Sequence, residues 1–191
     1  MRRKLVCALT TVCVLLLCGC ADGSSRGREA FEDFRESYVS QNFTCTADIT
    51  ANIGGSVFEC RVEFQKDANG ESVTVLEPLE ISGITARMDK EKTTIEYEGV
   101  ILDVGGAEDS GLTPVSAMFA VDRAWREAVF QEASRTEFNN TDCWQVAFSP
   151  YDTSAGSVTQ TLIFTKDDCR PVLAELFCGG ERMITVEYIY Q

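Results

Sequence analysis

The chain has 191 residues, no histidine, and 30 acidic against 17 basic side chains, which gives a formal net charge of −13. So acidic a chain repels the phosphates of nucleic acids and of anionic lipid headgroups, and we expect no nucleic-acid binding. Without histidine there is no Ser-His-Asp or Cys-His nucleophile and no His-Glu-x-x-His zinc site. We therefore expect a protein that is not an enzyme and uses no cofactor or metal.

The N-terminus has the order of a secretory signal. Arg2, Arg3 and Lys4 are followed by an uncharged, largely apolar run from Leu5 to Leu17. That run is thirteen residues long, whereas a helix that spans a membrane needs about 20 apolar residues. We therefore expect residues 1–19 to be a removable signal peptide and not a permanent anchor.

The signal ends in Leu17-Cys18-Gly19-Cys20, which resembles the bacterial lipobox. The resemblance implies cleavage after the small residue Gly19 and a lipid on Cys20. Cys18 is the rival acceptor, but it would place the bulky Leu17 before the cut. Two acyl chains suffice for stable anchoring, so we expect the protein on the extracytoplasmic face of a bacterial cell membrane, held through Cys20.

The mature chain would keep 172 residues and a net charge of −16, because the signal holds three basic residues and no acidic one. We expect residues 20–27 to form the lipidated cysteine and a short tether, and residues 28–191 to form a single domain. Five cysteines remain for that domain. Cys45 and Cys60 flank a predicted hairpin on the same strand face, so we expect a disulfide between them, unless all five are small buried apolar residues.

Hydrophobic periodicity predicts a helix over about 28–40 and then antiparallel strands. From Phe43 apolar residues alternate with polar ones, the Gly54-Gly55 pair marks a turn, and Asn69-Gly70 is a strong hairpin signal. The strands expected in this half cover residues 43–49, 58–64, 73–76, 84–88, 93–97 and 100–104.

After a break at 105–114 the pattern becomes helical over 115–131, with Pro114 suited to the first turn. Four more strands are expected over 143–148, 158–165, 171–177 and 183–190. The order helix, strands, helix, strands predicts an α+β domain in which a strongly curved antiparallel sheet is covered by an N-terminal helix and a central helix.

This order and three sequence runs resemble the LolA/LolB-like lipoprotein-localisation superfamily, especially its small lipid-anchored members of Gram-positive type. The runs are VTVLEPLEISGITARM, TTIEYEGVILDVGG and VTQTLIFTKDDCRPVLAELFCGGERMITVEYIY. The resemblance covers the chain from Phe43 onward. It implies a half-open β-barrel closed on one side by helices, with an apolar cavity that holds acyl chains in the carrier members.

A curved sheet of this kind can enclose a lipid chain between its apolar face and a covering helix. The residues expected to line such a cavity are Phe43, Phe58, Phe64, Leu76, Trp125 and Phe164. The same side chains can instead simply fill the core. We therefore expect a membrane-anchored lipoprotein that binds a lipid, lipopeptide or other apolar ligand. The alternative is a lipoprotein of the same fold that docks another envelope protein and carries no ligand.

Overall fold

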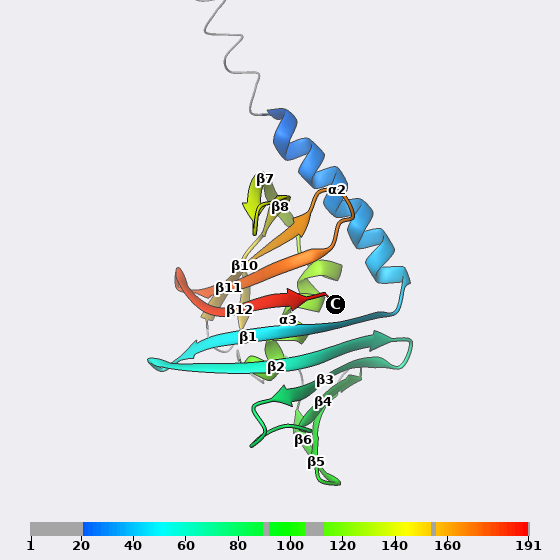
Figure 1. The fold of residues 1–191 in the computed structure, drawn as a ribbon, viewed down its shortest axis with the longest axis vertical. Helices are drawn as coiled ribbons and strands as arrows, with labels where there is room; N and C mark the ends of the chain where they lie inside the picture. The colour runs from blue at the N-terminus through cyan, green and yellow to red at the C-terminus, as the bar shows by residue number, and fades with distance from the viewer. Residues whose placement is uncertain (1–20, 90–91, 106–112, 154–155, 191) are drawn as a thin grey trace, which may run out of the picture.

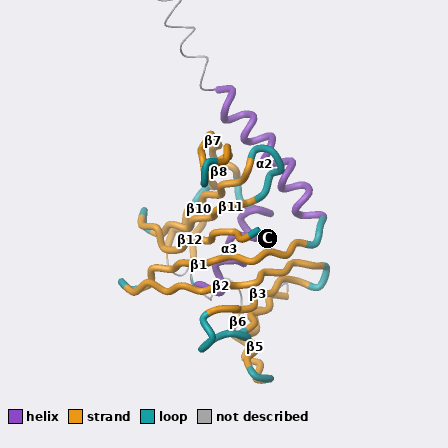
Figure 2. Tube along the Cα trace, viewed as in Figure 1, coloured by secondary structure: helices purple, strands orange, loops and turns teal. Residues whose placement is uncertain are grey.

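The computed structural model describes residues 21–89, 92–105, 113–153 and 156–190. They form two helices and twelve strands (Figures 1 and 2). In chain order these are α2 (Ala21–Ser40), β1 (Phe43–Ile53), β2 (Ser56–Asp67), β3 (Gly70–Glu77), β4 (Thr85–Asp89), β5 (Lys92–Tyr97), β6 (Val100–Gly105), α3 (Pro114–Glu127), β7 (Phe130–Phe138), β8 (Thr141–Phe148), β9 (Tyr151–Thr153), β10 (Gly156–Thr165), β11 (Pro171–Cys178) and β12 (Glu181–Ile189).

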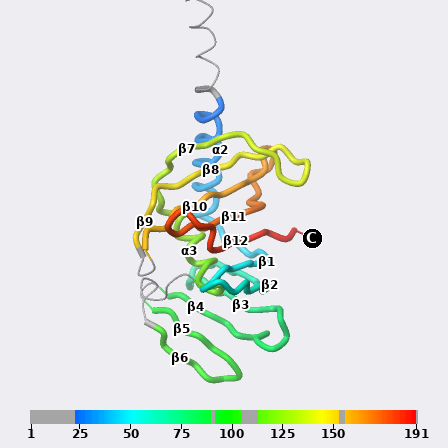
Figure 3. The backbone as a smooth tube through the Cα atoms, turned by 90° about the vertical axis from the view of Figure 1, so that its left-hand side faces the viewer, coloured from blue at the N-terminus to red at the C-terminus, as the bar shows by residue number. Residues whose placement is uncertain are grey.

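One antiparallel sheet holds all twelve strands. Its order is β6-β5-β4-β3-β2-β1-β12-β11-β10-β8-β7, and β9 pairs with β10. In the turned view the strands curve from β7 and β8 at one end to β5 and β6 at the other, with α3 inside the curve (Figure 3). The predicted α+β class, with a strongly curved antiparallel sheet and two helices, is confirmed.

The first hairpin forms as its sequence predicts. Buried and open positions alternate along β1, where Cys45, Ala47 and Ile49 face the core. Gly54 and Gly55 both have positive φ, which glycine adopts without steric cost. They make the turn into β2, so β1 and β2 pair from end to end.

Helix α3 begins with a capping box, in which the side chains of Thr113 and Ser116 each bond the other's backbone, and Pro114 occupies its first turn. It ends at Glu127, four residues before the predicted end. The guanidinium of Arg35 on α2 donates to the carbonyls of Trp125 (2.8 Å) and Ala128 (2.7 Å). This side-chain cap from another helix stops α3, and β7, which was not predicted, follows directly.

Helix α2 begins at Ala21, so the segment 21–27 predicted as a tether is helical. Gly27 is buried in the helix interior. A Cβ on it would lie 2.6 Å from Ala133 Cβ and 2.9 Å from Trp144 Cε3. The helix therefore extends because its backbone packs closely against β7 and β8.

Candidate functional site

Four of the six predicted lining residues gather in an aromatic cluster between the sheet and the helices. The ring centroid of Phe43 lies 6.3 Å from that of Phe64 and 6.2 Å from that of Trp125. Phe34 joins Phe164 to the same cluster, at 6.1 Å from Phe164 and 5.4 Å from Trp125. Much of the concave face is thus filled by packed rings.

Phe58 and Leu76 stay outside this cluster. Phe58 shares a face with Phe64 but sits near the β1–β2 turn, where it is 39% exposed. Leu76 is 37% exposed. A register shift between β2 and β3 falls beside it, since Val62 pairs with Val75 whereas Arg61 pairs with Glu77. A bulge of this kind re-aims one side chain, and the sequence pattern did not reveal it.

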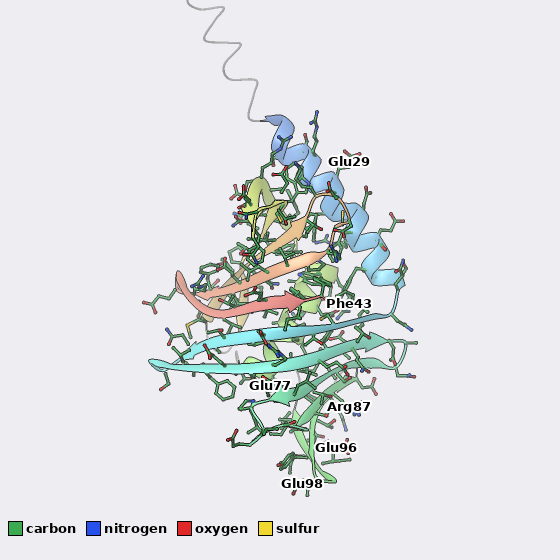
Figure 4. All side chains as sticks on the ribbon, in the orientation of Figure 1. Glu29, Phe43, Glu77, Arg87, Glu96 and Glu98 are labelled. Carbon is green, nitrogen blue, oxygen red and sulfur yellow. The ribbon has the colours of Figure 1, made fainter. Side chains whose placement is uncertain are left out.

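A pocket of about 330 Å³ opens where the C-terminal end of α2 meets the start of β1, the β10–β11 loop and the end of β12. Its lining residues are Asp33, Phe34, Ser37, Tyr38, Gln41, Asn42, Phe43, Asp168, Cys169, Arg170, Pro171 and Tyr190. Phe43 lies at the beginning of β1, beside the end of β12 (Figure 4). Phe43 is also the single predicted lining residue that borders this pocket.

The pocket has an aromatic wall and a polar rim. Phe34, Tyr38 and Phe43 belong to the packed cluster behind it. At the rim the Arg170 guanidinium pairs with Asp168 (2.5 Å) and lies 5.0 Å from the ring centroid of Tyr190. An apolar wall with a few polar groups at its mouth suits an apolar ligand with a polar end.

Behind the pocket lies a buried ionic cluster that sequence analysis missed. Tyr38 Oη donates to Asp122 Oδ1 (2.6 Å), and Arg126 Nε donates to Asp122 Oδ2 (2.6 Å). Arg126 also bonds Glu71 Oε1 (2.8 Å), and Lys66 Nζ donates to the Tyr38 carbonyl. The cluster joins α2, α3, β2 and β3.

Glu71 and Asp122 share one guanidinium in this cluster. Burial, together with the neighbouring Asp122 carboxylate, raises the pKa of Glu71 to about 8, although Arg126 opposes the rise. The Asp122 side chain is 1% exposed and both of its oxygens are bonded. The pocket lining contains neither carboxylate. The pair therefore crosslinks the elements that carry it.

The sequence does contain a signal for this ionic cluster. Lys66 continues the inward alternation of Val62 and Phe64, and Asp122 lies on the buried face of α3 between Val121 and Trp125. A charged residue at a position where the pattern demands an apolar one is the signal that could have revealed the cluster.

The predicted disulfide is absent from the structure. Both Cys45 and Cys60 face the core, as expected, and both thiols are free. The strand register pairs Cys45 with Phe64 and Cys60 with Ile49. The two cysteines are thus four residues out of register, roughly 13 Å along the strands, whereas bonded cysteines have Cα atoms within about 7 Å.

Cys20 and the signal peptide lie outside the described residues. Neither of the two described helices is long and apolar enough to cross a membrane. Within the described part of the chain, no three Cys, Asp or Glu side chains gather in a way that could hold a metal ion.

No protein-family model matches the sequence, and no curated protein is significantly similar to it. Solved structures do resemble this fold. A domain assigned as an outer membrane lipoprotein-sorting protein, from Vibrio parahaemolyticus, matches with a TM-score of 0.50 and 12% identity over 80% of this chain and 72% of that one. An uncharacterized conserved protein from Thermus thermophilus matches with a TM-score of 0.51 and 11% identity, over 85% and 84% of the chains.

A LolA superfamily protein from Nitrosomonas europaea is also similar, with a TM-score of 0.47 and 13% identity over 86% of this chain and 91% of that one. At such identities a likeness concerns the fold alone. The curved, unclosed sheet with its two helices is the architecture that the sequence resemblance predicted, and the chain therefore has a LolA-like fold.

Proposed function

We propose that this protein is a bacterial envelope lipoprotein, anchored through a lipid on Cys20, that binds a lipid or other apolar ligand on the concave side of its half-barrel. The lipobox-like ending of the signal supports the anchor. The LolA-like fold supports an extracytoplasmic binding protein and not an enzyme.

The pocket at the end of α2 is the observation that carries the ligand proposal. Its volume of about 330 Å³ lies at the lower end of the range of small-molecule sites. Phe34, Tyr38 and Phe43 offer ring surface to an acyl chain. Arg170 and the neighbouring polar side chains offer hydrogen-bond partners to its polar end.

The anchor is tested by metabolic labelling of the full chain with a radiolabelled fatty acid. The wild-type protein and the Cys18→Ala variant are expected to incorporate label and to sediment with membranes. The Cys20→Ala variant is expected to incorporate none. Label on Cys20→Ala and none on Cys18→Ala would move the lipid to the rival cysteine.

The ligand is tested by native mass spectrometry of the full chain purified from its own host, with Cys20→Ser to remove the anchor. Added mass that organic extraction removes is the expected result. Ser37→Trp, which fills the pocket from the exposed face of α2, should abolish that mass, whereas Ser40→Trp on the same helix, outside the lining, should keep it. A bare mass at every extraction strength would overturn the ligand proposal.

A second candidate function, docking of an envelope protein, is favoured by the apolar side chains exposed at one end of the sheet. Large apolar side chains are exposed at the β3–β6 end of the sheet, among them Leu79 (85%), Ile101 (64%) and Leu102 (59%). Exposed apolar patches commonly mark protein contacts. A photo-crosslinking residue at Ile101, but not one at Ser40, should then link the chain to a defined partner in its host.

A further inference from the structure

Gln160 and Tyr151 are among the described side chains that have buried polar atoms without hydrogen-bond partners. Gln160 on β10 is 1% exposed, and neither its Nε2 nor its Oε1 is bonded. The hydroxyl of Tyr151 on β9 is also buried and unbonded. Buried side-chain polar atoms almost always have a partner, so each exception calls for an explanation.

The strand register brings these two side chains together. Tyr151 pairs with Val158, and Gln160 follows two residues later on the same face of β10. Such diagonal neighbours on paired strands have Cβ atoms less than about 8 Å apart. The Gln160 amide offers one donor nitrogen and one acceptor oxygen, and the Tyr151 hydroxyl can donate or accept. These groups thus face one region of the half-barrel, the corner between β9 and β10.

The surroundings of this corner are apolar. Val158 and Leu162 flank Gln160 on its own strand, and Leu176 pairs with it across β11; all three are fully buried. Burying an amide among such side chains without partners is costly. A leucine would fill a similar space without that cost, so these polar atoms need a partner that the described residues do not supply.

The charge balance at this corner selects a neutral partner. Burial raises the pKa of Tyr151, and the positive charge of Arg123 on α3 opposes that rise. Arg123 is paired with Glu127 (3.8 Å). Among the described residues, Arg123 is the cation that acts on Tyr151, and an anionic headgroup would lose its hydration at the buried hydroxyl while competing with Glu127 for that guanidinium.

We propose that Gln160 and Tyr151 form a hydrogen-bonding site for the neutral polar group of an amphiphile, an acyl ester or acyl amide with an adjacent hydroxyl or N–H. The proposal rests on the proposed function, because it takes the ligand to be an amphiphile on the concave face. It adds a ligand class and a second polar anchor, in the first half of β10, whereas the pocket below α2 lies beyond the other end of that strand.

The test compares two pyrene-labelled probes of equal chain length, a monoacylglycerol and an alkane, bound to the full chain in one detergent at one concentration. Gln160→Leu and Tyr151→Phe are each expected to weaken binding of the acylglycerol by about tenfold or more while leaving the alkane unchanged. Tyr151→Phe removes a single oxygen atom, so it tests the site even if Gln160→Leu fails to fold.

Thr93→Val is the matched control. Thr93 Oγ1 is also buried and unbonded, but it lies on β5, at the other arm of the sheet. This variant is expected to bind both probes as the wild type does.

The other outcomes separate the two proposals. If the wild type binds both probes and neither variant changes its preference, the polar atoms bind only water and the inference is wrong while the proposed function stands. Equal loss of both probes in Tyr151→Phe would mean that the corner acts through shape, which also overturns the inference. A wild type that binds neither probe overturns the proposed ligand binding and this site together.

Discussion

Tyr38 and Asp122 are joined by a buried 2.6 Å hydrogen bond that spans 84 residues of sequence and links α2 to α3. Burial and the Asp122 carboxylate raise the pKa of Tyr38, so its hydroxyl stays a donor at every physiological pH. The bond holds the helix that forms one pocket wall against the helix that fills the half-barrel.

Tyr38→Phe should therefore destabilise the fold. It leaves Asp122 Oδ1 buried without its donor, which costs about 1–3 kcal/mol. Urea denaturation measures this as a lower midpoint with an unchanged slope. Tyr97→Phe, at an exposed site on β5, is the control and should change stability by less than about 0.5 kcal/mol. Equal effects of the two variants would show that the buried bond contributes nothing.

Glu71 gives the stability a defined pH dependence. Its pKa is about 8 in the folded chain against an ordinary value of 4.5, so the folded state holds this proton more tightly than the unfolded state does. Its contribution to stability is complete below about pH 4.5, falls as the pH rises, and is lost above about pH 8. The slope is at most about 1.4 kcal/mol per pH unit.

Glu71→Gln should remove this component. Urea midpoints of wild type and variant, measured from pH 5 to pH 9, are expected to diverge in slope below pH 8 and to run parallel above it. Glu98→Gln, at an exposed turn residue, should follow the wild type throughout. Parallel curves for Glu71→Gln over the whole range would mean that Glu71 stays charged when folded.

Gly27 is where α2 approaches the sheet most closely. Gly27→Ala places a Cβ under 3.0 Å from both Ala133 and Trp144, so the first turns of α2 should separate from β7 and β8. Hydrogen exchange should rise in those segments, and the melting temperature should fall.

Gly23→Ala on the same helix is the matched control for Gly27→Ala. Nothing lies within 4 Å of its new Cβ. Alanine is favoured over glycine in a helix by about 1 kcal/mol, so this variant should be neutral or more stable. If both variants behave alike, close packing at Gly27 does not fix the helix.

The free thiols of the first hairpin should be inert. Burial raises the pKa of Cys45 to about 12 and that of Cys60 to about 11, so little thiolate exists near neutral pH. Iodoacetamide at pH 8 should label both only after unfolding in urea. Non-reducing peptide mapping should find them unlinked, and a peptide pair joined through Cys45 and Cys60 would contradict the strand register.

The sequence was sufficient where the signal is local. Alternation along β1 and β2, the glycines of their turn and Pro114 at the start of α3 each predict an element that the structure confirms. The sequence pattern did not predict strand β7, because β7 is the last strand of the sheet and buries mainly Ala133. Its pattern is therefore polar. The early start of α2 was not predicted either, because Gly27 packs against Ala133 and Trp144, which lie more than a hundred positions away in the sequence.

Part of the candidate site could also be predicted from local sequence patterns, and part could not. Phe43, Phe64, Trp125 and Phe164 follow strand and helix periodicity, and the structure brings them together. Three other features depend on how distant elements pack. They are the contribution of α2 to the aromatic cluster, the ionic cluster behind the pocket and the unbonded atoms of Gln160. Periodicity along one element carries no information about its partners.

The pairing of β1 with β12 has a consequence for the order in which the molecule can assemble. Strands β1 to β6 form one run of hairpins and β7 to β12 another, and these two arms of the sheet meet only where β1 pairs with β12. Each arm can form from near neighbours as it is synthesised, whereas the seam requires closure of almost the whole chain. The sheet thus stays in two pieces until Glu181–Ile189 is available, and the hollow between the arms is the last part of the molecule to take shape.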